Sequence, residues 1–263
     1  MKAILLAAGY GTRLRPLTDR LPKELLHVGG RPIIDWILDS VAALPEVDEI
    51  HVVTNAAKIS AFEGWADGRD VTLHNDRTSS NDDRLGATGD IRFVIDESGL
   101  AGDALLVVAG DNLFEFSLGE YVEFWRSKNG GSAIAVHKLA DPSLASLYGV
   151  VELAADDRIV RLEEKPKFPR SNLVSTATYL FGREHLPLLL SYLDEGNPPD
   201  PPGRFIAWLY AREPVYGFRF LEQWLDIGDY GQLLEADNLY RARLGLAPRL
   251  EYVPGAATKT TES

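Results

Sequence analysis

Short apolar runs alternate with segments of helical periodicity along the first half of the chain. The run Ala3–Ala7 predicts a buried strand, and Pro32 suits the first turn of a helix whose apolar residues share one face: Ile33, Ile34, Ile37, Leu38 and Val41. Further strands are expected at Ile50–Thr54, Val71–Leu73 and Ala104–Ala109, with helices at Lys58–Ala66 and Gly86–Asp96. This alternation is typical of a mostly parallel sheet covered on both faces, so residues 1–131 are predicted to form a Rossmann-like α/β half.

From residue 132 strands outnumber helices. Apolar β-rich runs occur at Ser132–Lys138, Tyr148–Leu153, Ile159–Glu163, Leu173–Phe181 and Val215–Leu221. They predict an α+β half over residues 132–245 that shares its core with the first half. The proline-rich stretch Asn197–Gly203 is too short and rigid to link two domains, so we expect one domain over residues 1–245. Residues 246–263 are expected to form a C-terminal tail that frays from Gly255 onward.

The composition excludes several classes of protein. Because the chain has no cysteine, it has no disulfides, thiolate metal sites or cysteine nucleophiles, and any metal must be held mainly by oxygen. No apolar run is long enough to span a bilayer, and the N-terminus shows no signal-peptide pattern, so we expect a cytoplasmic protein with no membrane partner. A net charge of −12 without a stripe of lysine and arginine argues against nucleic acid as a partner.

Positive charge is nevertheless concentrated after the first strand. Residues 1–31 contain six basic residues and two acidic ones, a net charge of +4. Small residues let backbone amides approach an anion, and the threonine, arginine and lysine that follow suit phosphate. The candidate contacts are Ala8, Gly9, Gly11, Thr12, Arg13 and Lys23. The alternative interpretation is an ordinary tight turn whose charged side chains face solvent.

Two aspartates follow strands in opposite halves of the chain. Asp111 comes after the strand Ala104–Ala109 and Gly110, at the carboxyl edge where open α/β sheets bind ligands. Asp226 follows the strand Val215–Leu221. Together they could hold one Mg²⁺, which takes one or two protein carboxylates and completes its shell with water and phosphate oxygens. Each aspartate equally suits a turn or a helix cap, and spacing alone does not pair them.

A charged motif, Glu163-Glu164-Lys165-Pro166, follows another predicted strand. Pro166 holds the preceding residue in an extended exit from the strand. Glu164 could accept hydrogen bonds from sugar hydroxyls, and Lys165 could bind a sugar phosphate. A solvated charge cluster is the alternative.

Six motifs in this order resemble the sugar-phosphate nucleotidyltransferase family, of the glucose-1-phosphate thymidylyltransferase and uridylyltransferase type. They are LAAGYGTRLRPLTDRLPKELL (Leu6–Leu26), GRPIIDWIL (Gly30–Leu38), LLVVAGDNLF (Leu105–Phe114), YGVVE (Tyr148–Glu152), LEEKPKFPRSN (Leu162–Asn172) and WLDIGDYGQLLEADN (Trp224–Asn238). The resemblance spans nearly the whole chain. It implies the nucleotide-diphospho-sugar transferase type of α/β fold, with a three-layer, mostly parallel mixed sheet, a nucleotide-binding first half and a sugar-phosphate-binding second half.

The resemblance also implies a reaction and residue roles. A nucleoside triphosphate and a sugar 1-phosphate, with glucose 1-phosphate and dTTP or UTP expected, would give an NDP-sugar and pyrophosphate with the help of Mg²⁺. The implied nucleotide contacts are Ala8, Gly9, Gly11, Thr12, Arg13, Asn81 and Gly86. The implied sugar-phosphate contacts are Tyr148, Gly149, Glu164 and Lys165. Arg13, Lys23 and Lys165 would be catalytic, and Asp111 and Asp226 would bind the metal.

The stretch His74–Asp90 departs from the base-reading segment of thymidylyltransferases. Gly86 matches the glycine against which the base packs, and counting back five residues places Asn81 near the position of the base-reading glutamine. Because its amide is one methylene shorter, the choice of base stays open. The stretch Asn197–Trp208 departs from the expected sugar-site loop, which leaves the sugar open as well.

Two alternative functions remain at this point. One is a nucleotidyltransferase for a different phosphate acceptor, and the other is a catalytically silent regulatory protein that binds sugar nucleotides. The presence of Arg13, Lys23, Asp111 and Asp226 favours an enzyme. Three tryptophans suit either a homo-oligomer interface or the core: Trp65, Trp125 and Trp208.

Overall fold

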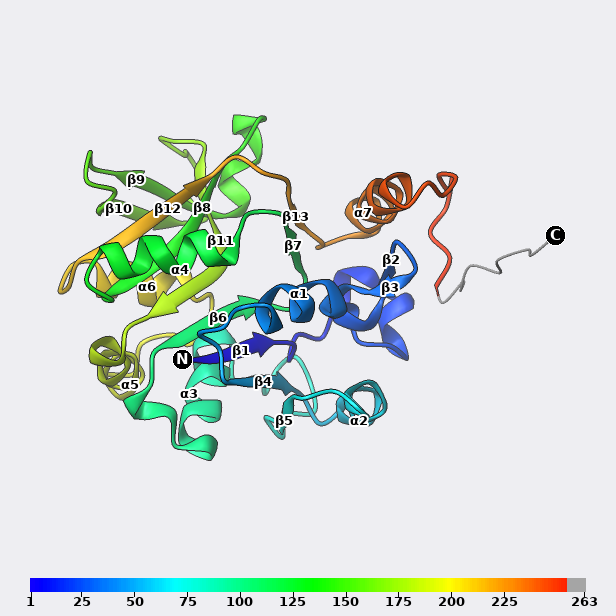
Figure 1. Ribbon diagram of the computed structural model, residues 1–263, viewed down its shortest axis with the longest axis horizontal. Helices are drawn as coiled ribbons and strands as arrows, with labels where there is room; N and C mark the ends of the chain where they lie inside the picture. The colour runs from blue at the N-terminus through cyan, green and yellow to red at the C-terminus, as the bar shows by residue number, and fades with distance from the viewer. Residues whose placement is uncertain (255–263) are drawn as a thin grey trace.

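The computed structural model describes residues 1–254, and its first half contributes four parallel strands to one sheet (Figure 1). The register places Leu6 beside Val53 on one side and beside Ala109 on the other. The carboxyl ends of these four neighbouring parallel strands therefore meet at one edge. These strands are β1 (Lys2–Leu6), β4 (Glu49–Thr54), β5 (Thr72–Asn75) and β6 (Leu105–Ala109).

Strand β11 joins the second half to the same sheet. It runs antiparallel to β6, with Tyr179 opposite Val107, and it also pairs with β8 and β9. The nine-stranded sheet has the order β10-β9-β11-β6-β1-β4-β5, with β8 branching from β11 and β12 from β8. The strands of this half are β8 (Ser132–Lys138), β9 (Gly149–Leu153), β10 (Ile159–Glu164), β11 (Leu173–Phe181) and β12 (Val215–Phe220).

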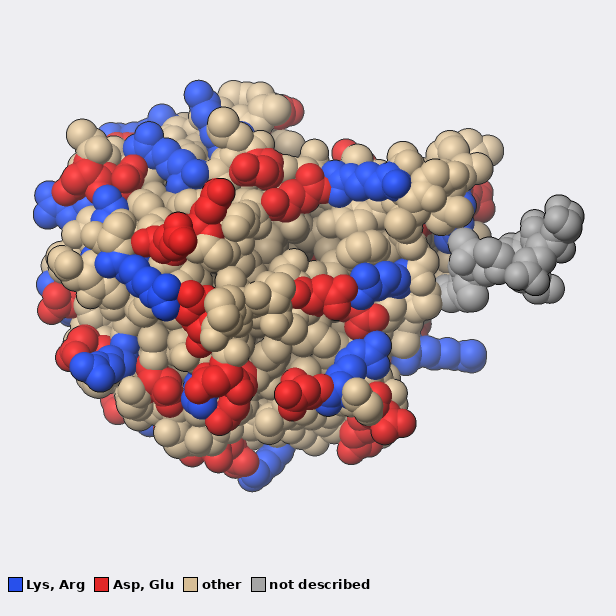
Figure 2. Space-filling view, viewed as in Figure 1, with Lys and Arg blue, Asp and Glu red and all other residues tan. Residues whose placement is uncertain are grey.

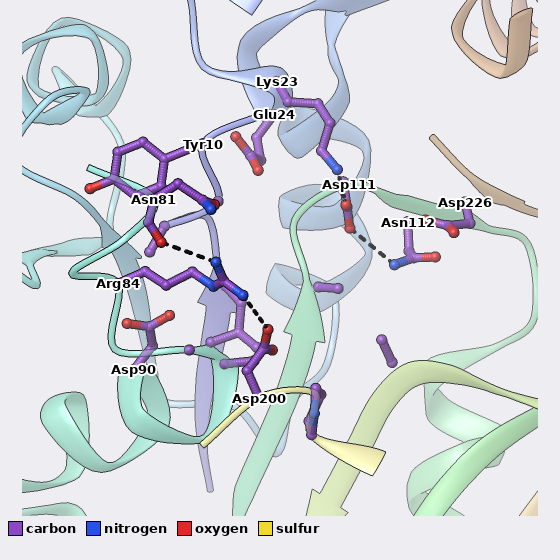
Figure 3. Close-up of a pocket in the computed structure, with 18 of the residues that line it drawn as sticks. Tyr10, Lys23, Glu24, Asn81, Arg84, Asp90, Asp111, Asn112, Asp200 and Asp226 are labelled. Atoms are coloured by element: carbon purple, nitrogen blue, oxygen red, sulfur yellow. Dashed lines mark hydrogen bonds and ion pairs between the residues drawn. The ribbon is translucent and has the colours of Figure 1, made fainter. Parts of the chain in front are cut away.

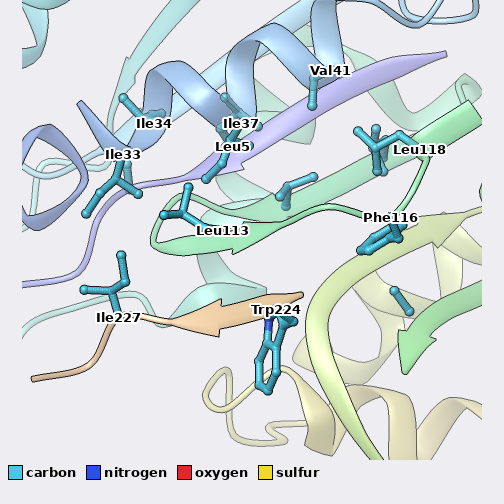
Figure 4. Close-up of a cluster of buried hydrophobic side chains, with 14 of the residues drawn as sticks. Leu5, Ile33, Ile34, Ile37, Val41, Leu113, Phe116, Leu118, Trp224 and Ile227 are labelled. Carbon is cyan, nitrogen blue, oxygen red and sulfur yellow. The ribbon is translucent and has the colours of Figure 1, made fainter. Parts of the chain in front are cut away.

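Helices cover both faces of the sheet and form the predicted three layers. Side chains alternate along β1, so Leu5 packs in one core with α1, α2, α4 and α7, and Ile4 packs in the other with α3, α5 and α6. In Figure 4 the isoleucines of α1 lie beside Leu5 in the first core. The helices are α1 (Ile33–Ala42), α2 (Ile59–Ala66), α3 (Ala87–Ser98), α4 (Leu118–Ser127), α5 (Leu186–Asp194), α6 (Gly203–Leu209) and α7 (Tyr230–Arg243).

The strands and helices predicted from periodicity are present, with small shifts at their ends. The strand expected at Val71–Leu73 lies at Thr72–Asn75, and the helix expected from Gly86 begins one residue later. Short 3₁₀ helices punctuate the connections: η1 (Thr12–Leu14), η2 (Leu17–Asp19), η3 (Lys23–Leu25), η4 (Leu100–Gly102), η5 (Pro142–Leu147) and η6 (Arg183–His185). Of the tryptophans that suited either an interface or the core, Trp65 is buried in the core.

Two short ladders were not predicted from the sequence. One pairs β2 (His27–Val28) with β3 (Arg31–Pro32), and the other pairs β7 (Asn112–Phe114) with β13 (Trp224–Asp226). The second ladder lies apart from the large sheet and joins residues more than a hundred positions apart in the sequence. Its strands are too short to show a periodicity of their own.

The first part of the expected tail packs against the body of the protein. Tyr252 is buried, and its hydroxyl accepts a hydrogen bond from the His27 backbone N–H at 2.9 Å. The fraying predicted from Gly255 onward falls outside the described residues.

The surface carries charges of both signs, and Figure 2 shows acidic and basic side chains interspersed on one face. Within residues 1–254 we find no helix with the length and apolar character needed to cross a membrane.

Candidate functional site

A cavity of about 600 Å³ opens at the carboxyl ends of β1 and β6 (Figure 3). This is the edge where parallel sheets place ligands, because the loops leave the strands there. Both halves of the chain contribute to its walls. The residues that line it include Ala8, Gly9, Tyr10, Arg13, Lys23, Glu24, Asn81, Arg84, Gly86, Asp90, Asp111, Asn112, Ala177, Asp200, Pro202 and Asp226.

The loop after β1 borders this cavity with its first residues and its arginine. Ala8, Gly9 and Arg13 line the space, whereas Gly11 and Thr12 do not. Gly11 has φ +58°, and a Cβ built on it would lie 2.9 Å from Thr18 Cγ2. The Thr18 hydroxyl donates to the Gly11 carbonyl at 2.7 Å. Gly11 is thus required by the packing of the loop itself, a role that the glycine pattern alone did not distinguish from ligand contact.

The β7–β13 ladder brings the two predicted metal-binding carboxylates into the same cavity. Asp226 at the end of β13 pairs with Asn112, the neighbour of Asp111, and the Ile227 N–H donates to the Asp111 carbonyl at 3.3 Å. The Trp224 indole N–H donates to Asn112 Oδ1 at 2.9 Å, and Asn112 Nδ2 donates to Asp111 Oδ1 at 3.0 Å. Asp111 also forms an ion pair with Lys23.

The surroundings of Asp226 disfavour its charged form, whereas those of Lys23 favour its charged form. Burial, together with the nearby charge of Asp111, raises the pKa of Asp226 to about 6, although Lys23, Arg13 and Lys165 oppose the shift. Burial lowers the pKa of Lys23, but the charges of Asp111 and Glu24 outweigh it and the net shift is upward. Lys23 therefore stays charged and is held at the carboxylates before any ligand enters.

Glu24 is a third carboxyl group at this end of the cavity. Its side chain is buried, and Oε2 has no hydrogen-bond partner. Burial raises its pKa to about 7, despite the neighbouring Lys23 charge. Sequence reasoning missed this residue, because a glutamate after a lysine carries no signal of burial.

A second cavity of about 140 Å³ adjoins the first and contains the predicted sugar-phosphate contacts. Tyr148, Gly149, Glu164 and Lys165 line it, and three residues line both cavities: Ala177, Pro202 and Asp226. Burial raises the pKa of Glu164, against the lowering effect of Lys165. The two cavities thus form one continuous site in which Asp226 stands at the junction.

Backbone strain is concentrated at this junction. Lys165 has φ +47°, so the extended conformation expected for the residue before Pro166 is wrong. The Lys165 N–H donates to the Tyr148 carbonyl at 3.0 Å. Ala177 has φ +54°, at a register shift of β11 between Ser175 and Tyr179. Positive φ costs a non-glycine residue on the order of 1 kcal/mol or more, and such residues cluster at functional sites. Nothing in the sequence marks Ala177, because alanine is not a residue that favours this conformation.

The donor set at the junction fits a hard divalent cation such as Mg²⁺. Asp111 and Asp226 supply carboxylate oxygens, and a cation would offset both the burial and the Asp111 charge that raise the pKa of Asp226. Within residues 1–254 no cluster of three or more His, Asp or Glu side chains is arranged to hold a metal by protein ligands alone. This suits Mg²⁺, which keeps several positions for water and substrate phosphate.

Comparison with known proteins shows the family of the chain. The family model described as nucleotidyl transferase matches residues 2–243. The chain belongs to this family. It is 30% identical over 242 residues to a bifunctional protein, GlmU, of Methanocaldococcus jannaschii, covering 90% of this chain and 54% of that protein. It is 30% identical over 246 residues to a glucose-1-phosphate thymidylyltransferase of Mycolicibacterium smegmatis, covering 92% and 82%.

A crystal structure shows the same fold. The protein of Bacillus anthracis described as a glucose-1-phosphate thymidylyltransferase, in complex with sucrose, superposes with a TM-score of 0.78 at 25% identity, covering 92% of this chain and 95% of that one. The resemblance to sugar-phosphate nucleotidyltransferases and the predicted fold class are therefore confirmed. The chain spans about half the length of the archaeal relative.

In this nucleotidyl transferase every site residue expected from the motifs lines one of the two cavities, except Gly11 and Thr12. Asn81 and Gly86 lie in the larger cavity. The proline-rich loop covers Gly86, because a Cβ there would lie 2.7 Å from Asp200 Cβ. The same loop reaches the smaller cavity, where a Cβ on Gly203 would lie 1.9 Å from Glu164 Oε2. The two stretches that depart from the expected pattern, His74–Asp90 and Asn197–Trp208, therefore meet at Gly86 and Asp200.

The raised pKa of Glu24 predicts a pH-dependent stability. Its pKa rises from 4.5 to about 7 on folding, so the native state keeps a proton that the unfolded chain releases. This stabilisation is complete below pH 4.5 and is lost as the pH rises through 7. We expect Glu24→Gln, a neutral isostere, to lose less stability between pH 5 and pH 9 than the wild type, by on the order of 2 kcal/mol.

Urea unfolding of the ligand-free protein at several pH values measures this difference. The exposed Glu123→Gln variant is the matched control and should follow the wild-type curve. Parallel curves for Glu24→Gln and wild type would show that Glu24 ionises normally in the folded protein.

Proposed function

We propose that this chain is a Mg²⁺-dependent enzyme that condenses a nucleoside triphosphate with a sugar 1-phosphate to give an NDP-sugar and pyrophosphate. One observation carries the proposal: a larger cavity with Arg13 and Lys23 and a smaller one with Glu164 and Lys165 meet at Asp226. Two substrates can therefore approach each other from opposite sides of a single charged junction.

The arrangement supports direct transfer between phosphates. A phosphate oxygen of the sugar 1-phosphate would bond to the α-phosphorus of the nucleotide, while the bond to the bridging oxygen breaks and pyrophosphate leaves. Such transfer depends on alignment and on neutralising charge, and it needs no covalent intermediate with the protein. Lys165 would orient the attacking phosphate, and Arg13 and Lys23 would hold the triphosphate.

The metal would be held by Asp111 and Asp226. When bound, Mg²⁺ supplies positive charge that neutralises the phosphate oxygens. Lys23 forms an ion pair with Asp111, which places the lysine where phosphate and metal would meet. Lys23 would contact the triphosphate beside the carboxylates that hold the metal.

The two alternative functions remain distinguishable. A different phosphate acceptor is supported by the proline-rich loop, which narrows the smaller cavity with Pro202 and Gly203. A silent regulatory protein has less support, because the charged groups needed for transfer all border the junction. The thymidylyltransferase relative supports a sugar phosphate as the acceptor. We infer that the reaction takes place in the cytoplasm.

We expect Asp111→Asn to lower turnover at least about a hundredfold, because it removes one charge from the metal site while preserving shape. The measurement is pyrophosphate release with Mg²⁺ across five nucleoside triphosphates and a panel of sugar 1-phosphates. Asp70→Asn, on the exposed surface after α2, is the matched control. Near-normal turnover of Asp111→Asn would remove this residue from the metal site, and silence of the wild type across the panel with retained nucleotide binding would favour the regulatory alternative.

Lys165→Ala should change the KM for one substrate more than the KM for the other. We expect the KM for the sugar phosphate to rise about tenfold or more, because a charged contact to its phosphate is lost, while the KM for the nucleotide changes by less than about threefold. Steady-state kinetics with each substrate varied in turn gives both values. Lys167→Ala, exposed two residues further on, should behave as the wild type. An equal rise in both KM values would place Lys165 elsewhere in the reaction.

A further inference from the structure

Tyr10 is an aromatic residue in the wall of the larger cavity, and the transfer chemistry gives it no role. It follows Gly9 in the loop after β1, and its side chain is partly exposed. Among residues 1–254 it belongs to neither of the two hydrophobic cores that pack on the faces of the sheet. Its ring is therefore a surface of the cavity rather than part of the packed interior.

A chain of hydrogen bonds holds this ring in place. The Tyr10 hydroxyl lies 2.9 Å from Thr78 Oγ1. The Thr78 hydroxyl in turn donates to the Asp76 carboxylate, at 2.8 Å and 3.0 Å from its two oxygens, and both residues are buried. A threonine hydroxyl has only one proton to donate, so Thr78 accepts from Tyr10. The chain thus ties the loop after β1 to the segment that follows β5.

This bond uses the polar end of Tyr10 and leaves the ring for a ligand. Burial raises the pKa of the Tyr10 hydroxyl, so the phenol stays neutral and keeps its donor proton near pH 7. A neutral ring does not repel an anionic ligand. Because the hydroxyl is already anchored, the ring loses little conformational freedom when a flat group packs on it.

The position of Tyr10 matches the base of a nucleotide rather than its phosphates. Figure 3 shows Tyr10 near Asn81 and Arg84 at one end of the cavity, away from Lys23 and Asp111 at the other. In the proposed reaction the cationic end holds the triphosphate. The base at the opposite end of the same molecule then lies at the Tyr10 end.

An aromatic ring and a polar side chain act on different parts of a base. Polar groups such as the Arg84 guanidinium, whose Nη1 donates to the Asn81 carbonyl at 3.0 Å, act on hydrogen-bonding edges, which differ from base to base. A ring acts on the flat face, which all bases share, and stacking on it adds affinity with little regard to sequence. Tyr10 therefore suits binding of any base rather than a choice among bases.

We propose that the Tyr10 ring stacks on the base of the nucleoside triphosphate bound in the larger cavity, and that Thr78 is a positioning residue that holds the ring through its hydrogen bond. The inference rests on the proposed function in placing a nucleoside triphosphate in this cavity. Tyr10 supplies affinity for the base, and the choice among bases is made by other groups.

Nucleotide binding without an acceptor substrate tests the contribution of the base. Calorimetric titration of the full chain with Mg²⁺ and each of GTP, UTP, dTTP, ATP and CTP should give at least one nucleotide that binds about tenfold or more tightly than inorganic tripolyphosphate. Tripolyphosphate has the phosphates without a base. This comparison needs no variant, and equal affinity for tripolyphosphate and all five nucleotides would overturn the proposal.

Two substitutions at Tyr10 separate stacking from other roles. Tyr10→Leu keeps an apolar side chain without the ring, and it should weaken nucleotide binding about tenfold or more, leave the ranking of the nucleotides unchanged and alter tripolyphosphate binding by less than about threefold. Tyr10→Phe keeps the ring and loses only its anchor, so nucleotide binding should stay within about threefold of the wild type. Tyr216→Leu, on β12 outside both cavities, is the matched control.

Circular dichroism establishes that each variant is folded. Unchanged nucleotide binding by Tyr10→Leu would overturn the proposal. An equal loss of nucleotide and tripolyphosphate binding in the folded variant would also overturn it, because Tyr10 would then act on the phosphates or on the shape of the loop.

Binding and turnover fail independently. Base-dependent binding that is lost in Tyr10→Leu, with no turnover of the wild type on any sugar phosphate, would support the role of Tyr10 and contradict the proposed reaction. Turnover with a nucleotide KM that Tyr10→Leu leaves unchanged would support the reaction and contradict the stacking.

Discussion

The pairing of β7 with β13 is the contact on which the rest of the site depends. It is only three residues long, yet it places Asp226 opposite Asn112 and so brings carboxylates from the two halves of the chain to one point. The Trp224 indole secures Asn112, and Asn112 in turn donates to Asp111. Burial raises the pKa of Asp226, and the nearby charge of Asp111 raises it further. A cation bound between these carboxylates, as proposed, would offset this unfavourable arrangement.

The same reasoning explains why basic residues gather here in a chain of net charge −12. Lys23 pairs with Asp111, and Arg13 and Lys165 both lower the pKa of Asp226. Glu24, by contrast, stays largely shielded from solvent with an unpartnered oxygen, and its raised pKa shows that burial outweighs the attraction of Lys23. The cavity therefore combines charges that compensate each other with one carboxyl group that is left close to neutral. In the proposed reaction an entering triphosphate would meet Lys23 already held by its ion pair with Asp111, so less side-chain entropy would be lost on binding.

Much of this architecture could be predicted from the sequence, because long elements carry a periodic signal. Strands such as Ala104–Ala109 are apolar throughout, and the helix after Pro32 repeats its apolar residues at the helical period. The pairing of Asp111 with Asp226 could not be derived, because it depends on a ladder too short to show periodicity. The burial of Glu24 and Asp90 could not be predicted either, because nothing in the neighbouring sequence distinguishes them from acidic residues exposed to solvent. Gly11 shows the reverse case, since a glycine expected at the ligand is required instead by its contact with Thr18.

The proline-rich loop at residues 197–203 contributes to the walls of both cavities. At one end Asp200 and Pro199 pack against Gly86, and at the other Gly203 lies against the Glu164 carboxylate. A Cβ at Gly86 would displace the loop, whereas a Cβ at Gly203 would displace the Glu164 carboxylate. A change that widens one cavity through this loop therefore moves the wall of the other, because Pro202 belongs to both. If the two cavities hold the proposed nucleotide and sugar phosphate, this loop contacts both sites, so substitutions in it would affect both substrates.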